Sequence, residues 1–240
     1  MTTMTLTPEH FLAIADHTLL APGTTPDELA EFMAQAVGLG VTRVCVSPSL
    51  LPVEKRGLEI VTVVGFPSGA HHSSIKAAEA RQAIADGADE IDMVVNAAFA
   101  HTGDWASLEA EIRAVREEVP GPHVLKVILE TAALTPDQIR AACNAAAAAG
   151  ADFVKTSTGF SPAGGATLEA VRIMAQTVGV AGGGALGVKA SGGIRTADDA
   201  RAMWEAGATR FGVSATEAII AGWSAGDATA TETPAERAGY

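Results

Sequence analysis

Short apolar runs alternate with longer segments of helical periodicity along most of the 240-residue chain. Each run holds about four to eight mainly apolar positions, a length typical of strands buried on both faces of a parallel sheet. Eight runs fit this description and predict eight strands. They lie near Ile14–Thr18, Arg43–Ser47, Glu59–Phe66, Glu90–Asn96, His123–Glu130, Phe153–Ser157, Leu186–Ser191 and Arg210–Ser214.

The segments between these runs predict helices, because apolar residues recur in them at helical spacing. Thr25-Pro26 and Thr135-Pro136 are strong start signals, since each places proline at the first helical position after a capping threonine. A helix-ending glycine recurs before every second predicted strand, which indicates an internal repeat. The predicted helices are Thr25–Leu39, Ser74–Asp86, Trp105–Val119, Thr135–Ala149, Thr167–Thr177 and Thr196–Ala206.

Strands that alternate with helices indicate an α/β protein with a parallel sheet. Eight such units in a chain of this length predict a closed (β/α)₈ barrel, a TIM barrel, as a single domain over residues 1–222. An open doubly wound sheet is the alternative, but no Gly-x-Gly-x-x-Gly motif follows the first predicted strand. Residues 223–240 lack a core-forming pattern and predict a flexible C-terminal tail.

The net charge and the cysteine content restrict the classes of binding partner and the cellular compartment that we expect. The formal net charge is −12, so the chain repels nucleic acid and anionic membranes, and we expect neither as a partner. Cys45 and Cys143 offer no disulfide framework, and we interpret them as reduced thiols, Cys45 as a small buried group. The first eight residues lack the basic and apolar segments of a signal peptide. Together these features predict a cytoplasmic protein.

Histidine placement gives no support for a bound metal. His71 and His72 are adjacent, so their side chains point in different directions, and no His-x-x-x-His occurs. We therefore expect these two residues in a solvated loop, and neither a metal nor another cofactor in the protein.

Two lysines lie at the ends of predicted apolar strands, where lysine is uncommon. They are Lys155 and Lys189, in a chain with five lysines and eleven arginines. Lysine is rarely buried unless it is paired or functional. Mutual repulsion and burial would both lower the pKa of these amines, and a neutral buried amine is the nucleophile of Schiff-base enzymes. A structural alternative is that each lysine extends along the surface into solvent.

Other polar residues share this edge of the predicted sheet, because active sites of such barrels form at the carboxyl ends of the strands. Asp92 could act in catalysis, cap a helix or pair with a lysine. Lys126 and Asp16 could belong to the same site or form a structural ion pair with each other. The full set is Asp16, Thr18, Cys45, Asp92, Asn96, Lys126, Lys155 and Lys189.

Four motifs in this order resemble the class I deoxyribose-phosphate aldolase family. The resemblance covers nearly the whole chain, starting at Asp16-His17-Thr18-Leu19-Leu20. The motifs are Glu90-Ile91-Asp92-Met93-Val94-Val95-Asn96, Leu125-Lys126-Val127-Ile128-Leu129-Glu130-Thr131, Phe153-Val154-Lys155-Thr156-Ser157-Thr158-Gly159 and Val188-Lys189-Ala190-Ser191-Gly192-Gly193-Ile194-Arg195.

The resemblance implies a role for each matching residue. Lys155 would form the Schiff base, and Lys189 would lower the pKa of Lys155 and join proton transfer. Asp92 would act as general acid and base with Lys189 and a water, with Lys126 and Asp16 extending the network. The implied reaction is reversible cleavage of 2-deoxy-D-ribose 5-phosphate to D-glyceraldehyde 3-phosphate and acetaldehyde, in deoxyribose phosphate catabolism. An iminium serves as the electron sink, so this chemistry needs no cofactor.

Glycine-rich loops after the last three strands predict a phosphate site, because glycine lets backbone N–H groups approach an anion closely. A hydroxyl could add a hydrogen bond. Phe160 departs from the family, some members of which carry a lysine there, so a possible cation is missing. The predicted substrate-binding residues are Thr158, Gly159, Gly192, Gly193, Gly212 and Ser214.

Three further expectations complete the prediction. Tyr240, the single tyrosine, could assist proton transfer, as the C-terminal tyrosine does in similar family members, or simply end a frayed tail. Two other functions stay open: a barrel isomerase or lyase that uses a carboxylate base, and a non-catalytic sugar-phosphate-binding barrel. Neither explains the lysine pair. The apolar barrel exterior favours a homodimer.

Overall fold

The structure is a computed structural model that describes residues 5–180 and 186–224. Its strands form a closed barrel in the sequential order β1 to β8, and every neighbouring pair, including β1 with β8, is parallel. The predicted TIM barrel is therefore confirmed, and the open sheet is wrong. The strands are β1 Ala15–Leu19, β2 Arg43–Val46, β3 Glu59–Val64, β4 Glu90–Val94, β5 Val124–Ile128, β6 Phe153–Lys155, β7 Gly187–Ser191 and β8 Arg210–Val213.

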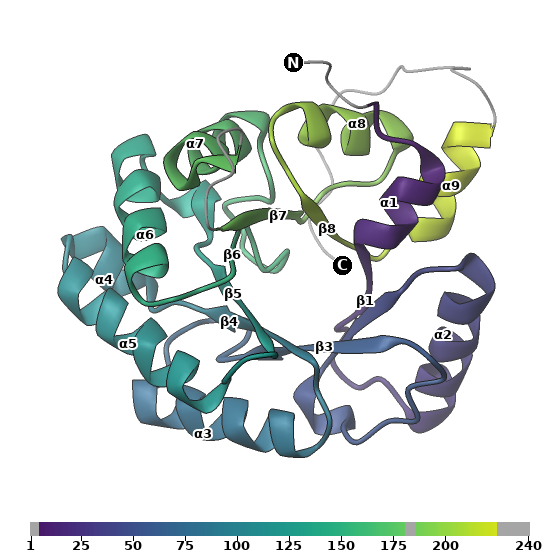
Figure 1. The fold of residues 1–240 in the computed structure, drawn as a ribbon, viewed down its shortest axis with the longest axis horizontal. Helices are drawn as coiled ribbons and strands as arrows, with labels where there is room; N and C mark the ends of the chain where they lie inside the picture. The colour runs from purple at the N-terminus through teal and green to yellow at the C-terminus, as the bar shows by residue number, and fades with distance from the viewer. Residues whose placement is uncertain (1–4, 181–185, 225–240) are drawn as a thin grey trace.

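Helices surround this ring of strands (Figure 1). The six predicted helices are present, although several of their ends differ by one or more residues. The α-helices are α1 Pro8–Ile14, α2 Pro26–Leu39, α3 Ser73–Ala85, α4 Ala97–Thr102, α5 Trp105–Glu118, α6 Pro136–Ala148, α7 Leu168–Val178, α8 Ala197–Glu205 and α9 Thr216–Ser224, with short 3₁₀ turns η1 Pro48–Leu50 and η2 Thr131–Ala133.

The predicted helix starts are confirmed in atomic detail. Thr25 and Thr135 each accept a hydrogen bond from the third residue of their helix, and the side chain of that residue bonds back to the threonine backbone N–H. The helix α1 was not predicted, although Thr7 and Pro8 carry the same signal, with Thr7 accepting from His10 N. Nor were α4 and α9 predicted.

The main hydrophobic core lies between the strands and the helices that cover them. On α6, small alanines such as Ala142 and Ala146 are fully buried, which lets this helix lie close to the barrel. Phe11 of α1 is fully buried and meets Phe211 of β8 and Trp223 of α9, each with ring centroids 5.3 Å apart. Two of the three unpredicted helices, α1 and α9, are thus joined through one aromatic cluster.

Within the described residues, no helix is long and apolar enough to cross a membrane. The helix α9 continues through Ser224, so the predicted domain boundary at residue 222 falls inside it. The rest of the predicted tail, residues 225–240, lies outside the described residues.

Candidate active site

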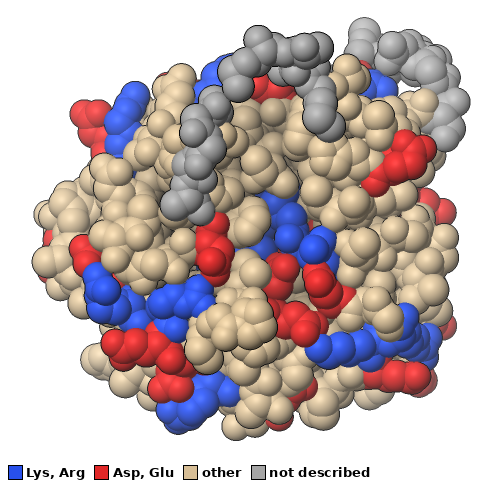
Figure 2. Space-filling model, in the orientation of Figure 1, with Lys and Arg blue, Asp and Glu red and all other residues tan. Residues whose placement is uncertain are grey.

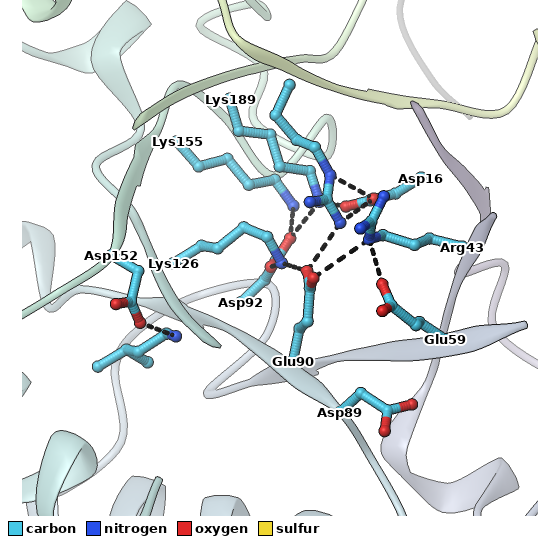
Figure 3. A network of polar contacts seen from close by, with 12 residues as sticks. Asp16, Arg43, Glu59, Asp89, Glu90, Asp92, Lys126, Asp152, Lys155 and Lys189 are labelled. Atoms are coloured by element: carbon cyan, nitrogen blue, oxygen red, sulfur yellow. Dashed lines mark hydrogen bonds and ion pairs between the residues drawn. The ribbon is translucent and has the colours of Figure 1, made fainter. Parts of the chain in front are cut away.

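Lys155 and Lys189 are register neighbours on β6 and β7, and both are buried. Each donates a hydrogen bond of 2.7 Å from Nζ to Oδ2 of Asp92 on β4 (Figure 3). Neither lysine extends into solvent, so the surface alternative is wrong. One carboxylate oxygen thus holds two amines from adjacent strands in the barrel interior.

Lys126 reaches the same carboxylate from β5, where its Nζ donates to Oδ1 of Asp92 at 2.8 Å. Asp16 on β1 is a second carboxylate partner of Lys189, in addition to Asp92. Lys126 and Asp16 do not pair with each other; each instead pairs with a neighbour of opposite charge. The structure therefore brings together all five charged residues predicted from strand ends, and Asp92 lies at their centre.

Two buried charged residues escaped the sequence analysis. Arg210 of β8 donates from Nε to Oδ1 of Asp16 at 2.7 Å and from Nη2 to Oε2 of Glu90 at 2.8 Å. Glu90 also pairs with Lys126. A signal existed for Glu90, since it precedes Asp92 by two positions on one strand and shares its face. Charges of both signs gather at the centre of the face shown in Figure 2.

The two neighbouring amines differ in charge state. Burial, with a further contribution from the Lys189 charge, lowers the pKa of Lys155 although Asp92 opposes the shift. Burial also acts to lower the pKa of Lys189, but the carboxylates of Asp16 and Asp92 outweigh it and raise that pKa. The prediction of a lowered pKa is supported for Lys155 and wrong for Lys189, because Lys189 contacts two carboxylates.

The carboxylate at the centre stays ionised. Burial acts to raise the pKa of Asp92, but the charges of Lys126, Lys155 and Lys189 outweigh it and hold that pKa well below its ordinary value. Cys45 faces the same groups, and burial raises the pKa of its thiol to about 11. The site therefore combines a carboxylate, a charged lysine and an amine of lowered pKa beside a neutral thiol.

Two other predicted strand-end residues serve local structure. Thr18 donates from its hydroxyl to the carbonyl oxygen of Asp16 at 2.9 Å. Asn96 caps α4 by accepting from Ala98 N at 3.1 Å. Neither contact reaches the lysines.

The loops after β6 and β7 meet closely at glycines. Gly159 and Gly192 both have φ +85, and a Cβ on Gly192 would lie 3.0 Å from the Cα of Gly165 and 3.4 Å from that of Gly159. Ala166 N donates to the carbonyl oxygens of Ser191 and Gly192. A side chain at position 192 would force these loops apart, so glycine is required for their approach.

The other predicted phosphate residues have different surroundings. Gly193 is exposed, with φ +83 and open space around it, and Ser214 is exposed just before α9. A Cβ on Gly212 would lie 3.0 Å from Cε of Lys189, so glycine there makes room for the lysine. Gly187 on β7 has a different role, because a Cβ there would overlap the ring of Phe153.

Thr158 is held by Glu130, which the sequence analysis did not select. The Thr158 hydroxyl donates to Oε2 of Glu130 at 2.6 Å and accepts from Phe160 N at 3.1 Å. Glu130 itself has φ 57, a left-handed conformation that is uncommon outside glycine. The tether fixes the loop that follows Lys155.

Phe160 adds an apolar wall where some family members carry a cation. Its ring packs edge-on against Phe66 with centroids 5.2 Å apart, beside the buried Cys45 and Val63. Tyr240 lies outside the described residues. Across residues 5–180 and 186–224, no group of three or more His, Cys, Asp or Glu is arranged to hold a metal ion.

Comparison with known proteins gives one consistent result. The sequence matches the model of the DeoC/LacD family of aldolases over residues 12–229. A deoxyribose-phosphate aldolase of Corynebacterium diphtheriae is 63% identical over 206 residues, 85% of this chain and 93% of the relative. One of Kocuria rhizophila is 56% identical over 218 residues, 90% and 98% of the two chains. The tetrameric deoxyribose phosphate aldolase structure of Aeropyrum pernix has a TM-score of 0.82 at 29% identity, covering 91% of this chain and 92% of that one.

Proposed function

Because the chain belongs to the DeoC/LacD family of aldolases, we propose that Lys155 is the amine that forms a Schiff base with the substrate. The activity is that of a deoxyribose-phosphate aldolase, which reversibly cleaves 2-deoxy-D-ribose 5-phosphate to D-glyceraldehyde 3-phosphate and acetaldehyde. This agrees with the resemblance seen in the sequence motifs. A carboxylate-base isomerase or a non-catalytic barrel is not favoured.

The choice of Lys155 rests on how the three amines around Asp92 are paired. In the described structure, Lys126 contacts the carboxylates of Asp92 and Glu90, and Lys189 contacts those of Asp16 and Asp92. Lys155 contacts Asp92 alone among the carboxylates of the described residues. It is also the amine whose lowered pKa favours the neutral, nucleophilic form.

The covalent sequence follows from this amine. Lys155 Nζ attacks C1 of the aldehyde form of the substrate, and loss of water gives an iminium. Removal of the proton from the C3 hydroxyl lets the C2–C3 electron pair move toward the iminium, which breaks that bond and releases D-glyceraldehyde 3-phosphate. The remaining enamine takes a proton at C2, and water releases acetaldehyde and restores the amine.

Lys189 and Asp92 are suited to different parts of the proton transfers. Lys189 is held protonated beside Lys155 and can donate a proton. Asp92 is held ionised by the lysines around it, which makes it a weak base by itself. We assign it the role of orienting the amines and of passing protons between Lys189 and a water, with Lys126 and Asp16 supporting it.

The phosphate of the substrate would bind at the glycine loops. Backbone N–H groups near Gly159, Gly192 and Gly193, with the exposed hydroxyl of Ser214, offer hydrogen-bond donors to an anion. Thr158 directly precedes Gly159, and Gly212 lies beside Cε of Lys189. Because Phe160 brings no charge, this binding depends on dipoles more than on ion pairing.

Borohydride trapping tests the assignment. Reduction in the presence of 2-deoxyribose 5-phosphate should leave a two-carbon adduct on Lys155, because cleavage leaves the acetaldehyde fragment attached. Peptide mass mapping locates the adduct. Lys155→Met should lose the adduct and nearly all turnover, since no amine replaces it.

Lys55→Met is the matched control, because Lys55 is partly exposed and pairs with Asp89 away from Asp92. It should keep both the adduct and the activity. A folded wild-type protein that shows no adduct on any lysine would reject the covalent mechanism.

We also propose that the protein is cytoplasmic, on the basis of its two free cysteines, and that it forms a homodimer. Val37 on α2 and Ile75 on α3 are large apolar side chains exposed on the barrel exterior, 48% and 56% accessible. Light scattering in solution would distinguish a dimer from the tetramer that is described for the Aeropyrum pernix relative.

A further inference from the structure

The buried ion pairs of the barrel interior close into a ring. Starting at Asp92, the contacts run to Lys126, then Glu90, Arg210, Asp16 and Lys189, and return to Asp92. Carboxylates and cations alternate around the whole circuit. Four of these contacts measure 2.8 Å for Lys126 with Asp92, 2.8 Å for Arg210 with Glu90, 2.6 Å for Arg210 with Asp16 and 2.7 Å for Lys189 with Asp92.

The charges of the ring sum to zero, because it contains three carboxylates and three cations. Its members are 0% to 6% accessible, so solvent does little to screen them. An unpaired charge is energetically costly under such burial. Removal of one charge from the ring therefore changes the pKa of the titratable groups beside it. Arg43 and Glu59, paired at 2.5 Å, attach to Glu90 from outside and add no net charge.

Lys155 is bound to this ring without belonging to it. It shares the Asp92 oxygen that already serves Lys189, and a proton on Lys155 would give the assembly a net positive charge. Other groups around Lys155 do not supply the missing carboxylate. Cys45 is a neutral thiol, and the Glu130 carboxylate accepts from Thr158.

We propose that Glu90 and Arg210 are positioning residues that close this neutral ring and thereby keep Lys155 as the amine around Asp92 that has no carboxylate of its own. This inference rests on the proposed function, because Lys155 has to be a neutral amine only if it forms a Schiff base. Neither residue needs to touch the substrate. Their effect reaches Lys155 through Asp92, Lys126, Asp16 and Lys189.

Charge balance predicts opposite shifts for the two single neutral variants. Arg210→Met leaves the ring with one excess negative charge, so protonation of Lys155 is favoured and its titration moves to higher pH. Glu90→Gln leaves one excess positive charge, so the titration moves to lower pH. Each shift should be about one pH unit, as expected for one charge acting at this range in a protein interior.

The measurement is the titration of the lysine side chains, followed by NMR of ¹³C-lysine-labelled protein. The chain has five lysines, so the ¹³Cε signals can be assigned by single Lys→Arg variants. This readout requires no turnover. If borohydride traps nothing but the shifts occur, the proposed function fails and the charge ring stands. If trapping succeeds and the shifts are absent, the ring proposal fails alone.

Two further variants separate charge balance from a structural role. The double variant Glu90→Gln/Arg210→Met removes one charge of each sign, so the Lys155 titration should return close to its wild-type position. Arg210→Lys keeps the charge and should shift it little. If the double variant is displaced further than both single variants, or if Lys126 loses its proton in place of Lys155 in Glu90→Gln, the proposal is wrong.

Where one single variant does not fold, the other single variant and the double variant still decide the matter, because the shift seen in the former should disappear in the latter. The acid side of the pH–activity profile should follow the same order, highest for Arg210→Met and lowest for Glu90→Gln. Profiles that move together in one direction would contradict the proposal.

Discussion

At the scale of single residues, the site shows how two identical side chains on adjacent strands acquire opposite properties. Lys155 and Lys189 share one oxygen of Asp92, but Lys189 also contacts Asp16. That second carboxylate outweighs the cost of burying an ammonium group and raises the pKa of Lys189, while Lys155 keeps a lowered pKa. The number of carboxylates around each amine decides which of them can act as the nucleophile.

Gly212→Ala should reduce activity by about tenfold or more, because small displacements of catalytic groups are costly. The new Cβ would lie 3.0 Å from Cε of Lys189 and 3.1 Å from Cβ of Ser191, so the lysine must shift within the network around Asp92. Steady-state kcat is the readout.

Gly38→Ala is the control for this change, because its Cβ would have nothing within 4 Å and lies in the exposed part of α2. It should leave kcat unchanged. Wild-type kcat in Gly212→Ala would show that the space at position 212 is not needed by Lys189.

At the scale of elements, the barrel relies on local signals that act before any tertiary contact. The helix α6 begins with a reciprocal cap in which Thr135 N donates to Oε1 of Gln138 at 2.9 Å and Gln138 N donates to Oγ1 of Thr135 at 3.3 Å. The face of α6 that is turned toward the core buries Ile139 and Cys143. Such helices support the strands that carry the lysines without taking part in the chemistry.

Thr135→Ala should lower the free energy of unfolding by about 1 kcal/mol, the usual cost of losing an N-cap hydroxyl. Urea unfolding measures this change. Thr135→Ser keeps the hydroxyl and should retain most of the stability. Activity should stay at the wild-type level in both variants, because α6 lies outside the barrel, and a large loss of kcat would contradict this separation of roles.

At the scale of the whole molecule, closure of the barrel places residues from both ends of the chain in one ion-pair network. Asp16 on β1 meets Lys189 on β7 and Arg210 on β8, separated from it by 173 and 194 positions in sequence. The same network ties the first strand to the last two. Its charges should therefore affect stability as well as reactivity.

The sign of the pH effect follows from the lowered pKa values of Asp16 and Asp92. A carboxylate with a folded-state pKa below its ordinary value of 3.8 contributes stability above that value, and the contribution is lost as pH falls through the folded-state pKa. Urea unfolding between about pH 5 and pH 2 should thus show a loss of about 2 kcal/mol or more. Asp92→Asn should flatten this dependence.

The exposed Asp137 provides the comparison, because its side chain is fully accessible on α6. Asp137→Asn should retain the wild-type dependence on pH. An equal slope in the wild type and in Asp92→Asn would show that the central carboxylate does not contribute to acid stability.

Much of the fold followed from local patterns. The eight strands, the two proline-threonine helix starts and the barrel closure were all predicted, because strand and helix periodicity is written into neighbouring residues. The coincidence of Asp16, Asp92 and the three lysines was also predicted, since the carboxyl ends of barrel strands converge. The helix α1 was missed although its start signal was present.

What only the tertiary structure decided is the charge of each buried group. Lys189 looked equivalent to Lys155 because both end apolar strands, and Glu90 and Arg210 looked like ordinary residues at strand starts. Their pairing depends on which strands become neighbours and on which carboxylate each amine reaches. Protonation is a property of the whole buried ensemble of charges, so it emerges only when the barrel closes.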